Sequence, residues 1–95
     1  MYTNAELSAI DRKYFVVILA DGYDVAVMSR NTHHMWRLHC VELSDGDMTV
    51  LFHSHQSTTP YHFQRHEWSM GTAIRYIRKH DIWQMNGRKP IRKSH

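Results

Sequence analysis

Histidines are the residues in this sequence best suited to chemistry, because nine of the 95 residues are histidine and four fall between positions 53 and 66. His53 and His55 are separated by one residue, so on a β-strand their side chains point to the same side. Two histidines presented in this way often bind zinc, and a third from the following segment would complete a three-histidine site with one open position. The spacing therefore makes His53, His55 and His66 a candidate Zn²⁺ site.

The same pattern has a plainer interpretation, in which His53 and His55 are partly buried strand residues and the later histidines are exposed in a loop. The spacing also resembles, in part, the metal motif of the JAMM metallo-isopeptidases, in which HSH is followed at the same interval by an aspartate ligand. Here His66 stands at the place of that aspartate and Phe63 at the place of the preceding serine. No upstream glutamate can be assigned as a general base, so a metal-dependent hydrolase is only a lesser alternative.

Positive charge is concentrated in the last third of the chain. Residues 1–63 carry four Lys and Arg against seven acids, a net charge of −3, whereas residues 64–95 carry eight against two, a net charge of +6. Cations interleaved with aromatic rings suit single-stranded nucleic acid, since the rings stack on bases while the cations neutralise phosphates. The alternative is a solvated helix face and tail. The candidate anion-binding residues are Arg65, Trp68, Arg75, Arg78, Lys79, Arg88, Lys89, Arg92 and Lys93.

Other catalytic arrangements are not indicated. Cys40 is the single cysteine, which excludes an intramolecular disulfide and fits a reducing, cytoplasmic compartment. His39 is its neighbour, but adjacent strand residues point to opposite faces, so the two side chains cannot form a nucleophile–base pair. The sequence has no glycine-rich phosphate loop, no nucleophile elbow and no apolar run near the ~20 residues that span a bilayer. Its first residues lack the charged and apolar regions of a signal peptide, so we do not expect one there.

The first half of the chain predicts a short helix and a hairpin. Thr3 and Glu6 match a capping box, which favours a helix over residues 4–13. Residues 14–20 and 23–29 are β-rich and flank Asp21-Gly22, which predicts a two-residue type I′ hairpin whose paired positions sum to 43. Both faces of this hairpin are apolar, so we expect its strands to be central in a sheet or sandwiched between other elements.

A second hairpin is predicted from residues 35–43 and 48–55 around Asp45-Gly46, with paired positions that sum to 91. Residues 56–65 contain many turn formers and are expected to form a loop. Residues 69–80 predict a helix, because four apolar residues repeat at helical spacing opposite Arg75 and Lys79. Residues 82–85 are expected to be an edge strand or an irregular extension. The apolar positions of the helix are Met70, Ala73, Ile74 and Ile77.

Together these elements predict an α+β domain over residues 1–87, followed by a basic tail over residues 88–95. Its antiparallel sheet would have about four strands, with the C-terminal helix on one face; a small curved barrel plugged by the helix is the alternative architecture. The favoured function is a non-enzymatic module that binds RNA or DNA. A protein-interaction or inhibitor domain with an acidic partner is the main alternative, and a histidine-rich metal-binding protein is the lesser one.

Overall fold

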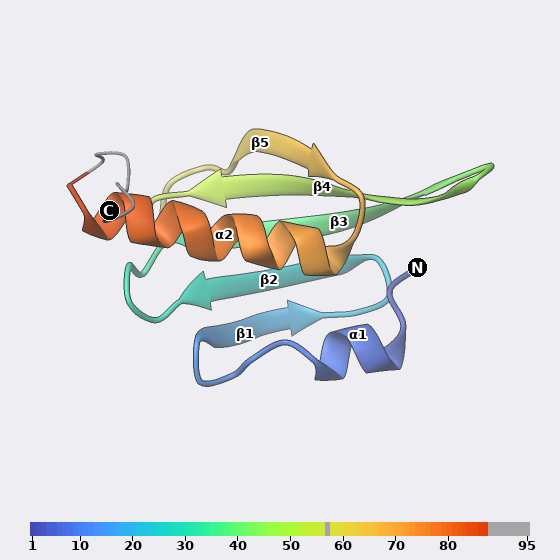
Figure 1. Ribbon diagram of the computed structural model, residues 1–95, viewed down its shortest axis with the longest axis horizontal. Helices are drawn as coiled ribbons and strands as arrows, with labels where there is room; N and C mark the ends of the chain where they lie inside the picture. The colour runs from blue at the N-terminus through green and yellow to red at the C-terminus, as the bar shows by residue number, and fades with distance from the viewer. Residues whose placement is uncertain (57, 88–95) are drawn as a thin grey trace, which may run out of the picture.

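The computed structural model describes residues 1–56 and 58–87, so the predicted basic tail lies outside the described residues. One antiparallel sheet contains five strands in chain order, with a short helix before it and a long helix across one face (Figure 1). The α+β class is confirmed, and the sheet is open and has five strands rather than four. The elements are α1 (Asn4–Ser8), β1 (Phe15–Ala20), β2 (Asp24–Ser29), β3 (Met35–Leu43), β4 (Gly46–Ser54), β5 (His62–Glu67) and α2 (Met70–Met85).

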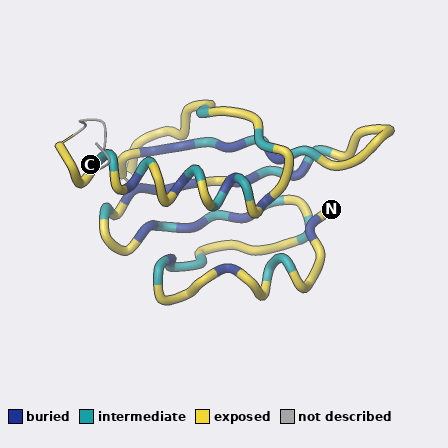
Figure 2. Tube along the Cα trace, viewed as in Figure 1, coloured by how far each residue is buried: buried dark blue, intermediate teal, exposed yellow. Residues whose placement is uncertain are grey.

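Helix α2 covers the sheet with the apolar stripe that its sequence predicts. Met70, Ala73 and Ile77 are buried, and Ile74 is half-buried against the same core. The sheet side of this core comes from the middle strands and includes Trp36, Val25, Val27, Leu38 and Leu51, all of them fully buried. Figure 2 shows the buried segments running along these strands beneath the helix. Because α2 covers only one face, the other face of the sheet remains half-exposed.

Both helices have limits that differ from the predicted ones. Helix α2 is capped by Ser69, at the predicted start of the helix, but it continues to Met85, so the prediction of a strand or irregular segment over residues 82–85 was wrong. The helix continues because Asp81, four residues after Ile77, is fully buried and extends the inward-facing stripe. Helix α1 has the predicted capping box but spans only Asn4–Ser8. No helix in the described part of the chain is long and apolar enough to span a membrane.

The first hairpin is shifted from its predicted register. Val16 pairs with Met28 rather than with Val27, and Ile18 is an extra residue in a β-bulge. The cause lies in the turn, where the Asp21 carboxylate accepts hydrogen bonds from the backbone N–H groups of residues 23 and 24 at 2.8 and 2.7 Å. Gly22 does not adopt the positive φ of a type I′ turn. The expectation that both strands are central was also wrong, because β1 is an edge strand and the Ile18 side chain is exposed.

The second hairpin has a register two positions from the predicted one. Trp36 pairs with His53 and Leu38 with Leu51, so paired positions sum to 89 rather than 91. A shift of two leaves every residue on its predicted face, because side chains alternate with a period of two. Trp36, Leu38 and His53 therefore share one face, as the predicted alternation implies, and it is the face that α2 covers. His55 lies just beyond the end of β4 instead of opposite Trp36.

The fifth strand arises from the segment that was predicted to be a loop. Residues 62–67 pair with β4, and Gln64 is an extra residue in a β-bulge, since Leu51 pairs with Arg65 while Phe52 pairs with Phe63. One extra residue reverses the alternation of side chains along a strand. His62 therefore lies on the helix-covered face, opposite His53, whereas His66 pairs with Val50 and lies on the other face.

Candidate metal centre

Three histidines from separate elements bring their ring nitrogens together between the sheet and α2. His34 precedes β3, His53 lies on β4 and His80 lies on α2, and one nitrogen from each lies within 4.8 Å of the other two. His34 Nδ1 and His53 Nε2 are 2.9 Å apart and share a hydrogen bond. In a tetrahedral zinc site, Zn–N bonds of ~2.0–2.1 Å place two nitrogens about 3.3 Å apart. Adjustments of roughly 1.5 Å or less would therefore bring the three rings onto one ion.

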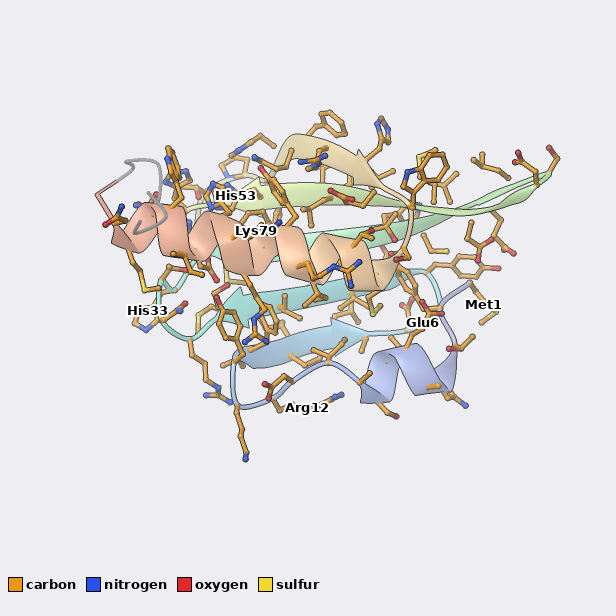
Figure 3. All side chains as sticks on the ribbon, viewed as in Figure 1. Met1, Glu6, Arg12, His33, His53 and Lys79 are labelled. Atoms are coloured by element: carbon orange, nitrogen blue, oxygen red, sulfur yellow. The ribbon has the colours of Figure 1, made fainter. Side chains whose placement is uncertain are left out.

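The Trp36 ring packs against two histidines of this cluster. It pairs with His53 across the two strands, and their rings stack with centroids 4.0 Å apart and an angle of 17°. The His80 ring meets the Trp36 ring edge-on at 5.1 Å and lies 4.8 Å from the His53 ring. Figure 3 shows His53 beside the C-terminal half of α2. The sheet and the helix thus hold two of the three rings against a fully buried indole.

His34 is positioned by the turn between β2 and β3. Ser29 closes this turn, since its N–H donates to the carbonyl of His34 at 3.0 Å and its carbonyl accepts from the N–H of His33 at 2.8 Å. His33 has a φ of 60°, an uncommon conformation for a residue other than glycine. The Thr32 hydroxyl oxygen accepts from the His34 N–H at 3.2 Å. The backbone that carries His34 is therefore fixed by three hydrogen bonds.

Asp81, next to His80 on α2, is a fully buried carboxylate that anchors two other segments. Tyr14 donates its hydroxyl hydrogen to Asp81 Oδ2 at 2.5 Å, and Thr32 donates to Oδ1 at 3.1 Å. Burial and the hydrogen bond to this carboxylate raise the pKa of Tyr14 to about 12, so its hydroxyl remains protonated. Asp81 therefore acts as a hydrogen-bond acceptor that holds the His34 turn against the helix.

Two further histidines lie at the exposed rim of the cluster. The His55 ring stacks on that of His34, with centroids 4.7 Å apart and an angle of 28°, and lies 4.9 Å from the His53 ring. His62 meets the His53 ring edge-on at 5.3 Å. Five histidine rings thus form one cluster, in which His34 and His53 are buried and His55 and His62 are exposed.

The environment of His53 keeps its imidazole neutral. Burial, together with the positive charge that neighbouring histidines acquire on protonation, lowers the pKa of His53 to about 3, and burial is the larger cause. A histidine binds a metal only through an unprotonated nitrogen. At neutral pH, His53 therefore has the protonation state that coordination requires.

The predicted metal ligands are brought together only in part. His53 and His55 lie side by side, but His66 lies on the opposite face of the sheet, where its ring is 5.0 Å from that of Phe63. The bulge at Gln64 causes this difference. The resemblance to the JAMM motif therefore does not extend to a shared set of ligands, because His66, at the place of that motif's aspartate, lies on the other face of the sheet.

Sequence reasoning did not assign the other three members of the cluster, His34, His62 and His80. A signal for His80 was present, since it follows Ile77 by three residues and Ala73 by seven, on the edge of the apolar stripe. His34 lies in a turn with no periodicity, and the pairing of β3 with β4, in which the next residue, Met35, lies opposite Ser54, brings it beside His53.

Two of the predicted anion-binding cations are engaged within the protein. The Arg65 guanidinium lies over the Tyr76 ring, 4.6 Å from its centroid, and pairs with Glu67 at 2.7 Å. The Arg78 guanidinium lies 4.4 Å from the centroid of the Tyr14 ring. Cation–π contacts of this kind stabilise the packing of α2 on the domain and leave these side chains less available to phosphate.

The other described candidates are more open to solvent. Arg75 and Lys79 are exposed one turn apart on α2, and Figure 3 shows Lys79 on the helix. Trp68 is 82% exposed and borders a hollow of about 310 Å³ that Arg65 and His66 also line. The remaining candidates, Arg88, Lys89, Arg92 and Lys93, lie outside the described residues.

Cys40 has the environment of a structural thiol. It is buried on the helix-covered face, and burial raises its pKa above the usual value. Its Sγ lies 3.7 Å from Asp47 Oδ2. A raised pKa disfavours the thiolate, which is the reactive form of cysteine.

Comparison with known proteins places this chain in no family: no family model, no curated protein and no solved structure matches it. The geometry of its own side chains is therefore the basis for a functional assignment.

Proposed function

We propose that this protein binds one divalent transition-metal ion, most simply Zn²⁺, through His34, His53 and His80. The observation that carries the proposal is the convergence of three imidazole nitrogens within 4.8 Å of one another from a turn, a strand and a helix. Imidazole ligands suit Zn²⁺, Cu²⁺, Ni²⁺ and Co²⁺, whereas Mg²⁺ and Ca²⁺ prefer oxygen. Three histidines leave one coordination position for water or another ligand.

The proposed role is metal binding rather than hydrolysis. Asp81 is the acidic side chain adjacent in sequence to the centre, and it accepts hydrogen bonds from Tyr14 and Thr32. This engagement argues against its use as a general base. An ion held by the three histidines would join the β2–β3 turn, β4 and α2, so its binding free energy would stabilise the folded domain.

The test is metal binding to tagless, chelator-treated protein. Titration with Co²⁺ should give the visible absorption of a tetrahedral complex at one ion per chain, and Zn²⁺ should displace it. His80→Ala and His34→Ala should each weaken binding by more than about 100-fold, the upper end of the loss from removing an outer-shell partner. His39→Ala and His66→Ala are matched controls, because both remove a histidine from the face of the sheet opposite the cluster.

Two outcomes would reject the metal centre. One is the absence of Co²⁺ absorption in the unsubstituted protein. The other is an equal loss of affinity in the cluster variants and in the controls, which would show that histidines bind the ion regardless of position.

A second candidate function is contact with a polyanion such as RNA or DNA. Its support is the exposure of Arg75 and Lys79 on one side of α2 and of Trp68 just before it, a combination of cations and an aromatic ring. An acidic protein partner remains the alternative for the same surface.

The polyanion candidate is tested by titration with fluorescent single-stranded and duplex oligonucleotides at low and moderate salt. Arg75→Glu/Lys79→Glu should abolish salt-sensitive binding, and Lys79→Glu should weaken it more than Lys13→Glu, which makes the same charge change elsewhere on the surface. No binding at low salt would reject nucleic acid, whereas an acidic protein would retain a hydrophobic component of binding at high salt.

A further inference from the structure

The two exposed histidines at the rim lie directly against the buried ones. The ring centroid of His55 lies 4.7 Å from that of His34, and the ring centroid of His62 lies 5.3 Å from that of His53. The two outer rings are themselves 6.4 Å apart. Solvent and the buried cluster are thus joined by a continuous set of imidazoles.

The fold fixes the backbone of both outer histidines. His62 opens β5 and pairs with His53 in the sheet. His55 follows Ser54, whose buried hydroxyl donates to the Gln56 carbonyl at 2.6 Å and thereby holds the turn after β4. No hydrogen bond to another described residue holds either imidazole, so the nitrogens of these exposed rings are accessible to a dissolved ion.

We propose that His55 and His62 form a capture pair, which takes a divalent transition-metal ion from solution and passes it to the buried histidines. This inference rests on the proposed metal-binding function. An ion must lose most of its coordinated water before it reaches the site, because the buried Trp36 ring packs beneath it. Histidines placed one after another along the way can replace these water ligands stepwise. The ion keeps its charge, and each step exchanges a water or an imidazole nitrogen for another imidazole nitrogen.

Capture makes the final transfer intramolecular. An ion held on the rim is at a high effective concentration for His34 and His53, so loading is faster than direct binding from solution. The capture pair does not bind the ion in the final complex. Its loss therefore slows association and dissociation by the same factor and leaves the dissociation constant unchanged.

The experiment is stopped-flow loading of metal-free protein with Co²⁺, followed by visible absorption. His55→Ala/His62→Ala should lower the association rate constant about tenfold or more, as expected for the loss of an intramolecular step. The final absorption spectrum and the dissociation constant should match those of the unsubstituted protein. The matched control is His39→Ala/His66→Ala, which removes two histidines from the other face of the sheet and should load at the unsubstituted rate.

The results separate this inference from the metal centre itself. An unchanged loading rate in His55→Ala/His62→Ala, or equal slowing in the control, would overturn the capture pair while leaving the metal centre intact. An altered final spectrum would also overturn it, because an outer histidine would then be a ligand of the bound ion. Failure of the unsubstituted protein to give a Co²⁺ spectrum would instead reject the proposed function on which the inference rests.

Discussion

Thr32 and Asp81 are joined by a 3.1 Å hydrogen bond that links the turn carrying His34 to the helix carrying His80. The same Thr32 hydroxyl accepts from the His34 N–H, so one oxygen couples the backbone of one candidate ligand to a carboxylate beside another. Groups of this kind fix the separation of metal ligands that come from different elements.

Replacement of Thr32 by Val should weaken Co²⁺ binding by about 10- to 100-fold, the range typical of outer-shell partners. Tyr14→Phe is the matched control, because it also removes one hydroxyl from Asp81, whereas the Thr32 hydroxyl in addition accepts from the His34 N–H. Thr32→Ser should restore affinity. Equal losses in Thr32→Val and Tyr14→Phe would contradict a role in positioning, and they would point to a general effect of Asp81 on stability.

His53 should make the metal-free protein less stable in mild acid. Its pKa is about 3 in the folded state and about 6.5 when unfolded, so the unfolded chain binds the additional proton between these values. The contribution of His53 to the unfolding free energy is therefore fully present above pH ~6.5. It falls as the pH decreases towards 3, by at most about 1.4 kcal/mol per pH unit. Urea unfolding at pH 7 and pH 5 with a chelator measures this slope, and His53→Phe should make it shallower. Identical slopes would refute the assignment.

Metal binding should raise the unfolding free energy of the protein. At a free Zn²⁺ concentration 100 times the dissociation constant, the gain is about 2.7 kcal/mol, and a chelator should reverse it. Thermal unfolding with and without Zn²⁺ measures the effect, and His80→Ala should show little of it. A similar gain in His80→Ala would indicate that the ion stabilises the fold from another location.

Two glycines should respond to alanine in opposite directions. Gly46, at the start of β4, has a φ of 143°, and a side chain there should cost about 1–3 kcal/mol of stability. Gly71 lies in the first turn of α2, and an added Cβ would meet only Ser69 Oγ at 3.8 Å. Gly71→Ala should therefore stabilise the protein by about 0.5–1 kcal/mol. Urea unfolding measures both, and a shift of the same sign in both variants would contradict this distinction.

Periodicity was sufficient to predict the fold class and the packed face of α2, because both depend on the spacing of apolar residues. The faces of β3 and β4 were also predictable despite the wrong register, since a shift of two residues preserves the alternation of side chains. The register itself was not predictable, because it depends on how a turn closes, as the Asp21 carboxylate shows.

The candidate site was less predictable than the fold. His53 was found from its strand spacing, but a bulge at Gln64 moved His66 to the other face, and local sequence gives no sign of such a bulge. Asp81 was missed because a carboxylate is not expected in a buried stripe unless its partners are known. Those partners, Tyr14 and Thr32, are distant in sequence.

The extra residues Ile18 and Gln64 both lie in the outermost strands of the sheet, one at each edge. A bulge interrupts the regular row of backbone donors and acceptors that another strand would need in order to pair. Neither edge of this small sheet therefore presents a regular template for strand addition. The two bulges thus also protect the folded protein against edge-to-edge aggregation.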